Sequence, residues 1–278
     1  MFMILLAVAS AVAYGTADFL GGTASRKANV FTVVAISAPA SLAVEALVLP
    51  FLGARWSAGS IGWGALSGVA SAFAFALLYH ALSIGPMVVM APITAIVSAA
   101  LPVMVGLAEG EHLSAAQAAG LPVAVSAIML VTVERSVSVA SVRPRAIAVA
   151  CLAGAAIATQ LITLDQAPHD SGVAPLLAGR AVSSLLVLGT AVAIRRRIDP
   201  GRPPVKIAAA AGTLDSLANL LFLLAARSGL LSVSAVIVAL YPAATIVLAR
   251  VVLTERISRT QWFGLATAAA GVALLALK

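Results

Sequence analysis

The sequence predicts an all-α membrane protein with ten transmembrane helices, arranged as two inverted five-helix repeats. The first observation is composition: 62% of the 278 residues are hydrophobic, 10% are charged, and the mean hydropathy is +1.10. A soluble domain is nearer half apolar and a quarter charged, and it could not cover this much apolar surface. The second observation is a series of ten apolar segments, and the third is an internal repeat.

The repeat places the same polar and glycine residues at a fixed spacing in both halves of the chain. A series of residues recurs 144 positions later without a gap: Gly85, Glu111, Ser114, Gln117 and Gly120 return as Gly229, Glu255, Ser258, Gln261 and Gly264. An offset of half the chain length indicates a duplicated unit. In each copy the Ser is expected to cap the start of the following helix.

The ten apolar segments each approach the roughly 20 residues that a membrane span requires. They cover residues 2–24, 30–51, 60–82, 87–108, 114–134, 146–166, 172–194, 206–227, 232–253 and 260–277. Residues 1–134 form the first five-helix repeat, 135–145 a polar, basic linker, and 146–278 the second repeat. An odd number of crossings turns the second copy upside down relative to the first, and such proteins bind substrate near the membrane midplane.

The net charge of +7 comes from basic residues in the short loops. This distribution favours contact with anionic lipid headgroups over nucleic acid. Twelve Lys and Arg residues lie in the loops after the first, fifth, seventh and ninth segments, and three lie on the other side. The positive-inside rule places the twelve in the cytoplasm and both termini outside. The single Cys151 has no metal-ligand spacing around it, so neither a metal nor another cofactor is expected.

Polar residues inside the spans are the candidates for substrate binding, because each is costly in hydrocarbon. Tyr14 and Asp18 share one face of the first segment. Gln160 lies in a polar turn of the sixth segment, and Tyr241 precedes a proline in the ninth. The complete candidate set is Tyr14, Asp18, Gln160, Arg180, Asp215, Asn219 and Tyr241.

Arg180 and Asp215 are the charged pair expected at depth, since a buried charge needs a partner. They either neutralise each other and fix the packing, or line a cavity in which one of them meets the substrate. Asp18 and Asp215 are the candidate carboxylates for substrate or proton binding. Glu45 lies near the end of the second segment and is either an interfacial carboxylate or, like the other polar residues within the spans, a functional candidate.

Several stretches give the chain a resemblance to EamA-type members of the drug/metabolite transporter superfamily. They include YGTADFLGG near the start, and the Gly, apolar span, Glu and Ser order that ends each half. The resemblance implies transport, often export, of a small solute through a central cavity. It also implies cytoplasmic termini, in conflict with the charge count. An arginine is frequent in the family's seventh helix, matched here by Arg180, whereas the basic loop after the second helix is reduced to Arg55.

We therefore expect a secondary transporter, an exporter or facilitator of a small polar or amphipathic metabolite, working by alternating access in the inner (plasma) membrane. Its partners would be that metabolite, membrane lipids and, as a coupling ion, protons. A flippase for a lipid-linked sugar is one alternative and needs a cleft open to lipid. An intramembrane enzyme is the other, but the sequence contains no cluster of metal ligands or of nucleophile and base. We expect no catalytic residues.

Overall fold

The computed structural model describes residues 1–25, 27–28, 30–84, 87–132, 143–193, 204–253 and 257–277. The first half contains α1 (Phe2–Ser25), α2 (Val30–Leu52), α3 (Ala58–Ile84), α4 (Met87–Ala108) and α5 (Ala115–Thr132). The second contains α6 (Pro144–Asp165), the short 3₁₀ helix η2 (His169–Ser171), α7 (Ala174–Ala193), α8 (Val205–Arg227), α9 (Leu231–Val238), α10 (Tyr241–Leu253) and α11 (Arg259–Ala276). The described residues contain no strand, and a single β-bridge joins Ala54 to Gly172.

The observed helices follow the predicted segments closely, with one break. The ninth segment is divided into α9 and α10, and the backbone turns at Ala239 and Leu240. Pro242 follows at the second position of α10, where its missing N–H costs no helical hydrogen bond. The break therefore leaves Tyr241 at the start of a half-helix inside the bundle.

The helices are long and apolar enough to make the chain an integral, multi-pass membrane protein. Within the described residues, eight of them, with α9 and α10 counted as one, meet the length and hydropathy of a membrane span, so the predicted count of ten is not confirmed. Of the other two, α7 has the shorter apolar stretch Ala174–Thr190, and α11 is not among the eight.

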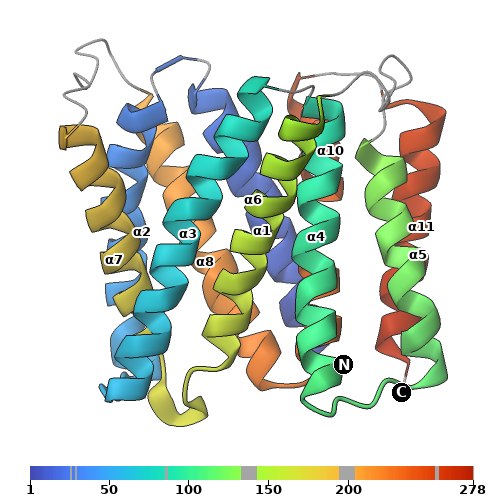
Figure 1. Cartoon of the computed structure of the whole chain (residues 1–278), viewed down its shortest axis with the longest axis horizontal. Helices are drawn as coiled ribbons and strands as arrows, with labels where there is room; N and C mark the ends of the chain where they lie inside the picture. The colour runs from blue at the N-terminus through green and yellow to red at the C-terminus, as the bar shows by residue number, and fades with distance from the viewer. Residues whose placement is uncertain are drawn as a thin grey trace.

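The two halves of the chain are interleaved rather than side by side. The most extensive helix contacts pair α1 with α8, α5 with α11, and α3 with α6 and α7. The Ser10 hydroxyl, for example, donates to the carbonyl of Ala218, 208 residues later, at 2.8 Å. Figure 1 shows the resulting bundle, with both termini at the same end as the α4–α5 and α6–α7 loops. Neither half could form these contacts without the other.

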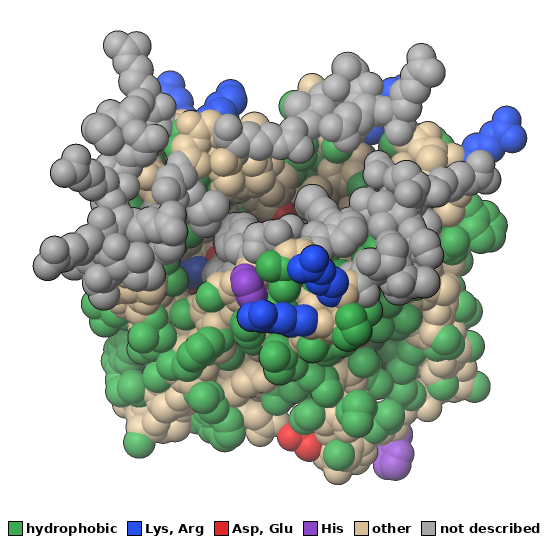
Figure 2. All heavy atoms as spheres, turned by 45° about the horizontal axis from the view of Figure 1, so that its top comes forward, with side chains coloured by type: hydrophobic (Ala, Val, Ile, Leu, Met, Phe, Trp, Pro, Cys, Tyr) green, Lys and Arg blue, Asp and Glu red, His purple; other side chains and the backbone are tan. Residues whose placement is uncertain are grey.

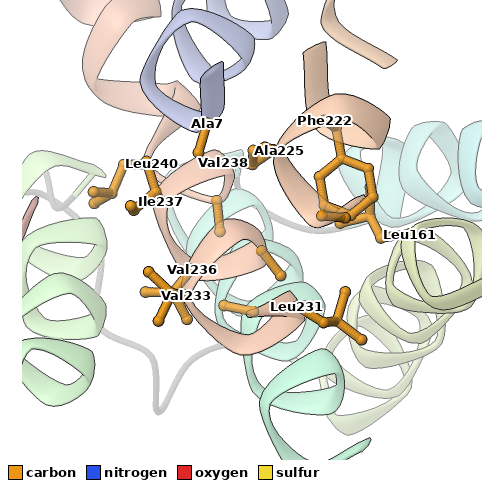
Figure 3. Close-up of a cluster of buried hydrophobic side chains, with 14 of the residues drawn as sticks. Ala7, Leu161, Phe222, Ala225, Leu231, Val233, Val236, Ile237, Val238 and Leu240 are labelled. Atoms are coloured by element: carbon orange, nitrogen blue, oxygen red, sulfur yellow. The ribbon is translucent and has the colours of Figure 1, made fainter. Parts of the chain in front are cut away.

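The buried core is centred on α9. All eight of its side chains are buried, and they pack with apolar residues of α1, α6 and α8, among them Ala7, Leu161, Phe222 and Ala225 (Figure 3). Because α9 has no exposed face, it sits within the bundle and not against lipid.

Helix starts in both halves use the same cap, as the repeat predicted. The Gln117 backbone N–H donates to the Ser114 hydroxyl at 3.2 Å, and the Ser114 N–H donates to the Gln117 side chain at 3.0 Å. Ser258 and Gln261 form the same reciprocal pair at the start of α11. This capping box satisfies N–H groups that the first helical turn leaves free. Glu255 lies outside the described residues.

Candidate functional site

Arg180 lies between two carboxylates in the middle of the helix bundle. A guanidinium nitrogen of Arg180 is 2.6 Å from a carboxylate oxygen of Asp215, and another is 3.6 Å from a carboxylate oxygen of Glu45. The side chains of Arg180, Asp215 and Glu45 are 12%, 22% and 3% exposed. The predicted Arg180–Asp215 pair is therefore present, and it is one side of a triad drawn from α2, α7 and α8.

Glu45 is part of this triad rather than an interfacial carboxylate. The Ser216 hydroxyl donates to Glu45 Oε1 at 2.9 Å and lies 3.0 Å from the carbonyl of Ser41. The Ser41 hydroxyl in turn donates to the carbonyl of Gly212 at 2.7 Å, which joins α2 to α8. Glu45 Oε2 is buried and has no hydrogen-bond partner among the residues that the structure describes. An unpaired buried acceptor is costly, so this oxygen is a place for a proton or a ligand donor.

Asn219 extends the polar network toward α6. Its side-chain amide nitrogen donates to the carbonyl of Asp215 at 2.8 Å, and its amide oxygen accepts from Gln160 at 2.9 Å. The Ser67 hydroxyl donates to the Gln160 carbonyl at 3.2 Å. The network therefore also ties α3 and α6 to the triad.

Tyr14, Asp18 and Tyr241 approach the same region from α1 and α10. Tyr14 is close enough to Asp215, Arg180 and Asn219 to interact with all three. Asp18 interacts electrostatically with Asp215 and with Tyr241. The structure thus brings the seven predicted residues together from five helices.

Close contact between α1 and α10 fixes this side of the site. Gly15 lies one residue after Tyr14, and a Cβ added to it would come within 2.7 Å of Ala244 Cβ and 3.0 Å of the Thr245 nitrogen. The Thr245 hydroxyl donates to the Gly15 carbonyl at 3.0 Å. The absence of a side chain lets the two backbones meet, as is common between helices in lipid.

The polar residues surround a small cavity. Its wall includes Glu45, Ser67, Ser71, Gln160, Arg180, Ser183 and Asn219. The cavity offers about 20 Å³ to the centre of a water-sized sphere, enough for roughly one water molecule. This cavity alone is therefore too small for a metabolite in this conformation.

The two ends of the molecule differ. Figure 2 shows a hollow in the face opposite the termini, with an acidic side chain visible inside it and Lys and Arg side chains around it. Asp18 is exposed. At the terminal end there is a depression of about 480 Å³, whose lining includes Met1, His112, Gly229 and Leu230. Between this depression and the polar residues lies the buried helix α9.

The site offers several kinds of polar contact. It combines carboxylates, a guanidinium, amides and hydroxyls from several helices. Within the described ranges, no three His, Cys, Asp or Glu residues are grouped so as to hold a metal ion. The arrangement can bind a small molecule through hydrogen bonds and charge.

Some residues of the network could not be assigned from the sequence. Ser216 and Ser67 are common residue types in apolar helices and gave no signal. Ser71 lies 144 residues before Asp215, at the equivalent position of the repeat, and is buried in the cavity wall.

Comparisons with known proteins agree with the membrane fold. Residues 144–277 match the model of the EamA-like transporter family. A solved crystal structure, described only as that of a protein, aligns with a TM-score of 0.81 at 15% identity, over 99% of this chain and 98% of the other. At that identity the likeness concerns the fold alone. The comparison with curated proteins gives no match.

Proposed function

The chain belongs to the EamA-like transporter family of the drug/metabolite transporter superfamily, and on this premise we propose that it carries a small polar or amphipathic metabolite by alternating access. It would act as an exporter or a facilitator. The observation that carries the proposal is the Glu45–Arg180–Asp215 triad at a cavity between apolar helices. Charged groups at membrane depth mark substrate and ion pathways.

We infer that the alternation depends on a ten-helix inverted repeat. Helix contacts occur in matched sets that support it: α1 with α8 corresponds to α6 with α3, and α3 with α7 corresponds to α8 with α2. The matching capping boxes support the same relation. In this scheme α9 and α10 together are the counterpart of α4. Rocking of the helices about the central site would expose it to each side in turn.

The coupling ion in this proposal is the proton, and its carriers are Asp18 and Asp215. Asp18 is exposed and has no ion pair among those the structure records, while Asp215 forms an ion pair with Arg180. A proton or a substrate ammonium group could neutralise the excess negative charge. Basic side chains around the hollow (Figure 2) favour a cytoplasmic position for that face in the inner membrane.

The enclosure of the site by helices favours a water-soluble metabolite over a lipid-linked sugar. A flippase would need the polar cleft to continue laterally into lipid. The triad instead has side chains only 3% to 22% exposed and is surrounded by α2, α3, α6, α7 and α8. The match to a transporter family favours transport over enzymatic activity.

The test has two steps. Purified protein in detergent is first screened by thermal shift against classes of metabolites, because a ligand that binds only the folded state raises its apparent stability. Any ligand found is then used with proteoliposomes containing wild type, Asp215→Asn or the control Asp170→Asn, whose carboxylate is exposed at the terminal end. We expect Asp215→Asn to fold and lose transport, and Asp170→Asn to keep it. Transport by Asp215→Asn at the wild-type rate would refute the role of this carboxylate.

A further inference from the structure

The start of α9 is capped by a carboxylate from the other half of the chain. The first N–H groups of a helix have no partner within it, and Leu230, at the N-cap position, provides no side-chain bond. Glu111, in the α4–α5 loop, accepts from the N–H of Leu231 at 2.5 Å and from that of Ser232 at 3.1 Å. It also accepts from the Ser232 hydroxyl. We call this group of contacts the Glu111 cap.

The end of α4 is shaped to hold this carboxylate in place. Gly110 has φ +91°, a conformation that favours glycine. Its N–H donates to Leu107 at 3.2 Å, and the Glu111 N–H donates to Gly106 at 2.9 Å. These two bonds form a Schellman ending. Gly106 also leaves room for the cap, because a Cβ there would collide with the Glu111 carboxylate and the Ser232 hydroxyl.

The capped helix lies between the terminal face and the candidate substrate site. Leu230, just before α9, lines the depression at the terminal end, and Tyr241, just after the turn that follows α9, belongs to the candidate site. Eight helical residues span about 12 Å. All eight side chains are buried, and they pack against residues of α1, α6 and α8 (Figure 3). A path along α9 between the site and the terminal face therefore requires this helix to move.

We propose that the Glu111 cap holds the terminal-side gate closed, and that opening the site to the terminal face requires Glu111 to release α9. This inference rests on the proposed transport function and adds a gating residue to it. A carboxylate at a helix N-terminus is stabilised by the helix dipole and by charge-assisted hydrogen bonds. The depression beside the cap gives water access to the carboxylate and to the freed N–H groups after release. The contacts can therefore break and re-form without leaving buried groups unsatisfied.

The test measures accessibility of each side and needs no substrate. In a Cys151→Ala background, Val233→Cys reports on the first turn of α9, where Val233 is 0% exposed. Asp18→Cys reports on the opposite side, where Asp18 is exposed. Each is labelled with a membrane-impermeant maleimide in nanodiscs, which leave both faces accessible. We expect Glu111→Ala to raise the labelling rate at position 233 by about tenfold or more, the factor expected for loss of one charge-assisted hydrogen bond. It should lower the rate at position 18.

A matched control removes a neighbouring carboxylate. Glu109 lies on the same loop and accepts from the Gln166 side chain at 2.7 Å. Because this bond does not involve α9, Glu109→Ala should leave both labelling rates unchanged. Glu111→Gln keeps one acceptor oxygen and should give an intermediate change. If Glu111→Ala does not fold, Ser232→Ala, which removes only the hydroxyl contact, should change the two rates in the same opposite directions.

Two outcomes would overturn the proposal. One is an unchanged rate at position 233 when the cap is removed. The other is a rise at both positions, because general loosening of the bundle exposes both sides whereas a gate exposes one and closes the other. These outcomes do not depend on finding the metabolite, so failure of the gate can be told apart from failure of the transport assignment.

Discussion

Replacing Arg180 with methionine should destabilise the protein more than replacing either of its carboxylate partners. Arg180→Met leaves Glu45 and Asp215 near each other without a cation, at 3% and 22% exposure. Removing one partner from a buried charge group costs about 3–5 kcal/mol. Asp215→Asn should be milder, because Arg180 keeps Glu45 as a partner at 3.6 Å. The free energy of unfolding should then fall by about 1.5–3 kcal/mol, the contribution of a hydrogen bond to a charged group.

The presence of Glu45 in the triad also determines which combination of substitutions should restore the stability lost in Arg180→Met. If Arg180 served Asp215 alone, the double variant Arg180→Met with Asp215→Asn would restore most of the stability. With Glu45 present, that double variant still leaves one buried carboxylate unpaired. Only the triple variant that adds Glu45→Gln removes every unpaired charge, so it should be more stable than Arg180→Met and than the double variant.

Reversible unfolding in mixed detergent micelles measures these differences as free energies. We expect the free energy of unfolding of Arg180→Met to be lower than that of Asp215→Asn by roughly 2 kcal/mol, the difference between the two ranges above. Equal stability of these two single variants would refute the shared-cation interpretation. Complete recovery in the double variant would show that Glu45 holds a proton and carries no charge.

Three further predictions concern packing, capping and orientation. Gly15→Ala should lower the free energy of unfolding by about 1–3 kcal/mol through overpacking against α10, whereas Gly22→Ala, with nothing within 4 Å, should raise it by up to about 1 kcal/mol through helix propensity; the same micelle assay compares them, and equal values would contradict the close contact. Ser258→Ala should cost about 1 kcal/mol by loss of the capping box, and a stability equal to wild type would show that this cap contributes nothing. A reporter that is active only in the cytoplasm, fused after Lys278, should give no signal; a strong signal would mean that the charge count fails to set the orientation.

The sequence contained enough information to place the helices, because spanning length and apolar runs are local properties. The Arg180–Asp215 pair was also predictable, since a lone charge in an apolar helix implies a partner. The triad was not, because Glu45 joins it only if α2 lies beside both α7 and α8. That neighbourhood depends on contacts between distant segments, about which a single sequence says little.

The Glu111 cap was missed for the same reason. The repeat drew attention to Glu111, but the local pattern predicted only the neighbouring Ser114 cap of α5. The Ser114 cap of α5 is indeed present, whereas Glu111 itself binds α9, about 120 residues further along the chain. Pro242 indicated from the local sequence that the helix could break in this region. The local sequence did not indicate that the break would fall at Ala239 and Leu240.

The interleaving of the two halves has a consequence for biosynthesis. The Ser10 hydroxyl finds its acceptor only when Ala218, 208 residues later, has been synthesised. At 5–20 residues per second, this interval is about 10–40 s. In the course of this interval the first five helices are completed, ahead of the second-half helices against which they mainly pack. Lipid tails solvate apolar helices as well as protein does, so the membrane can hold these helices unpaired until the second half arrives. Glu45, by contrast, is inserted before Arg180 is made, so the growing chain holds this carboxylate at membrane depth without its cation until α7 follows.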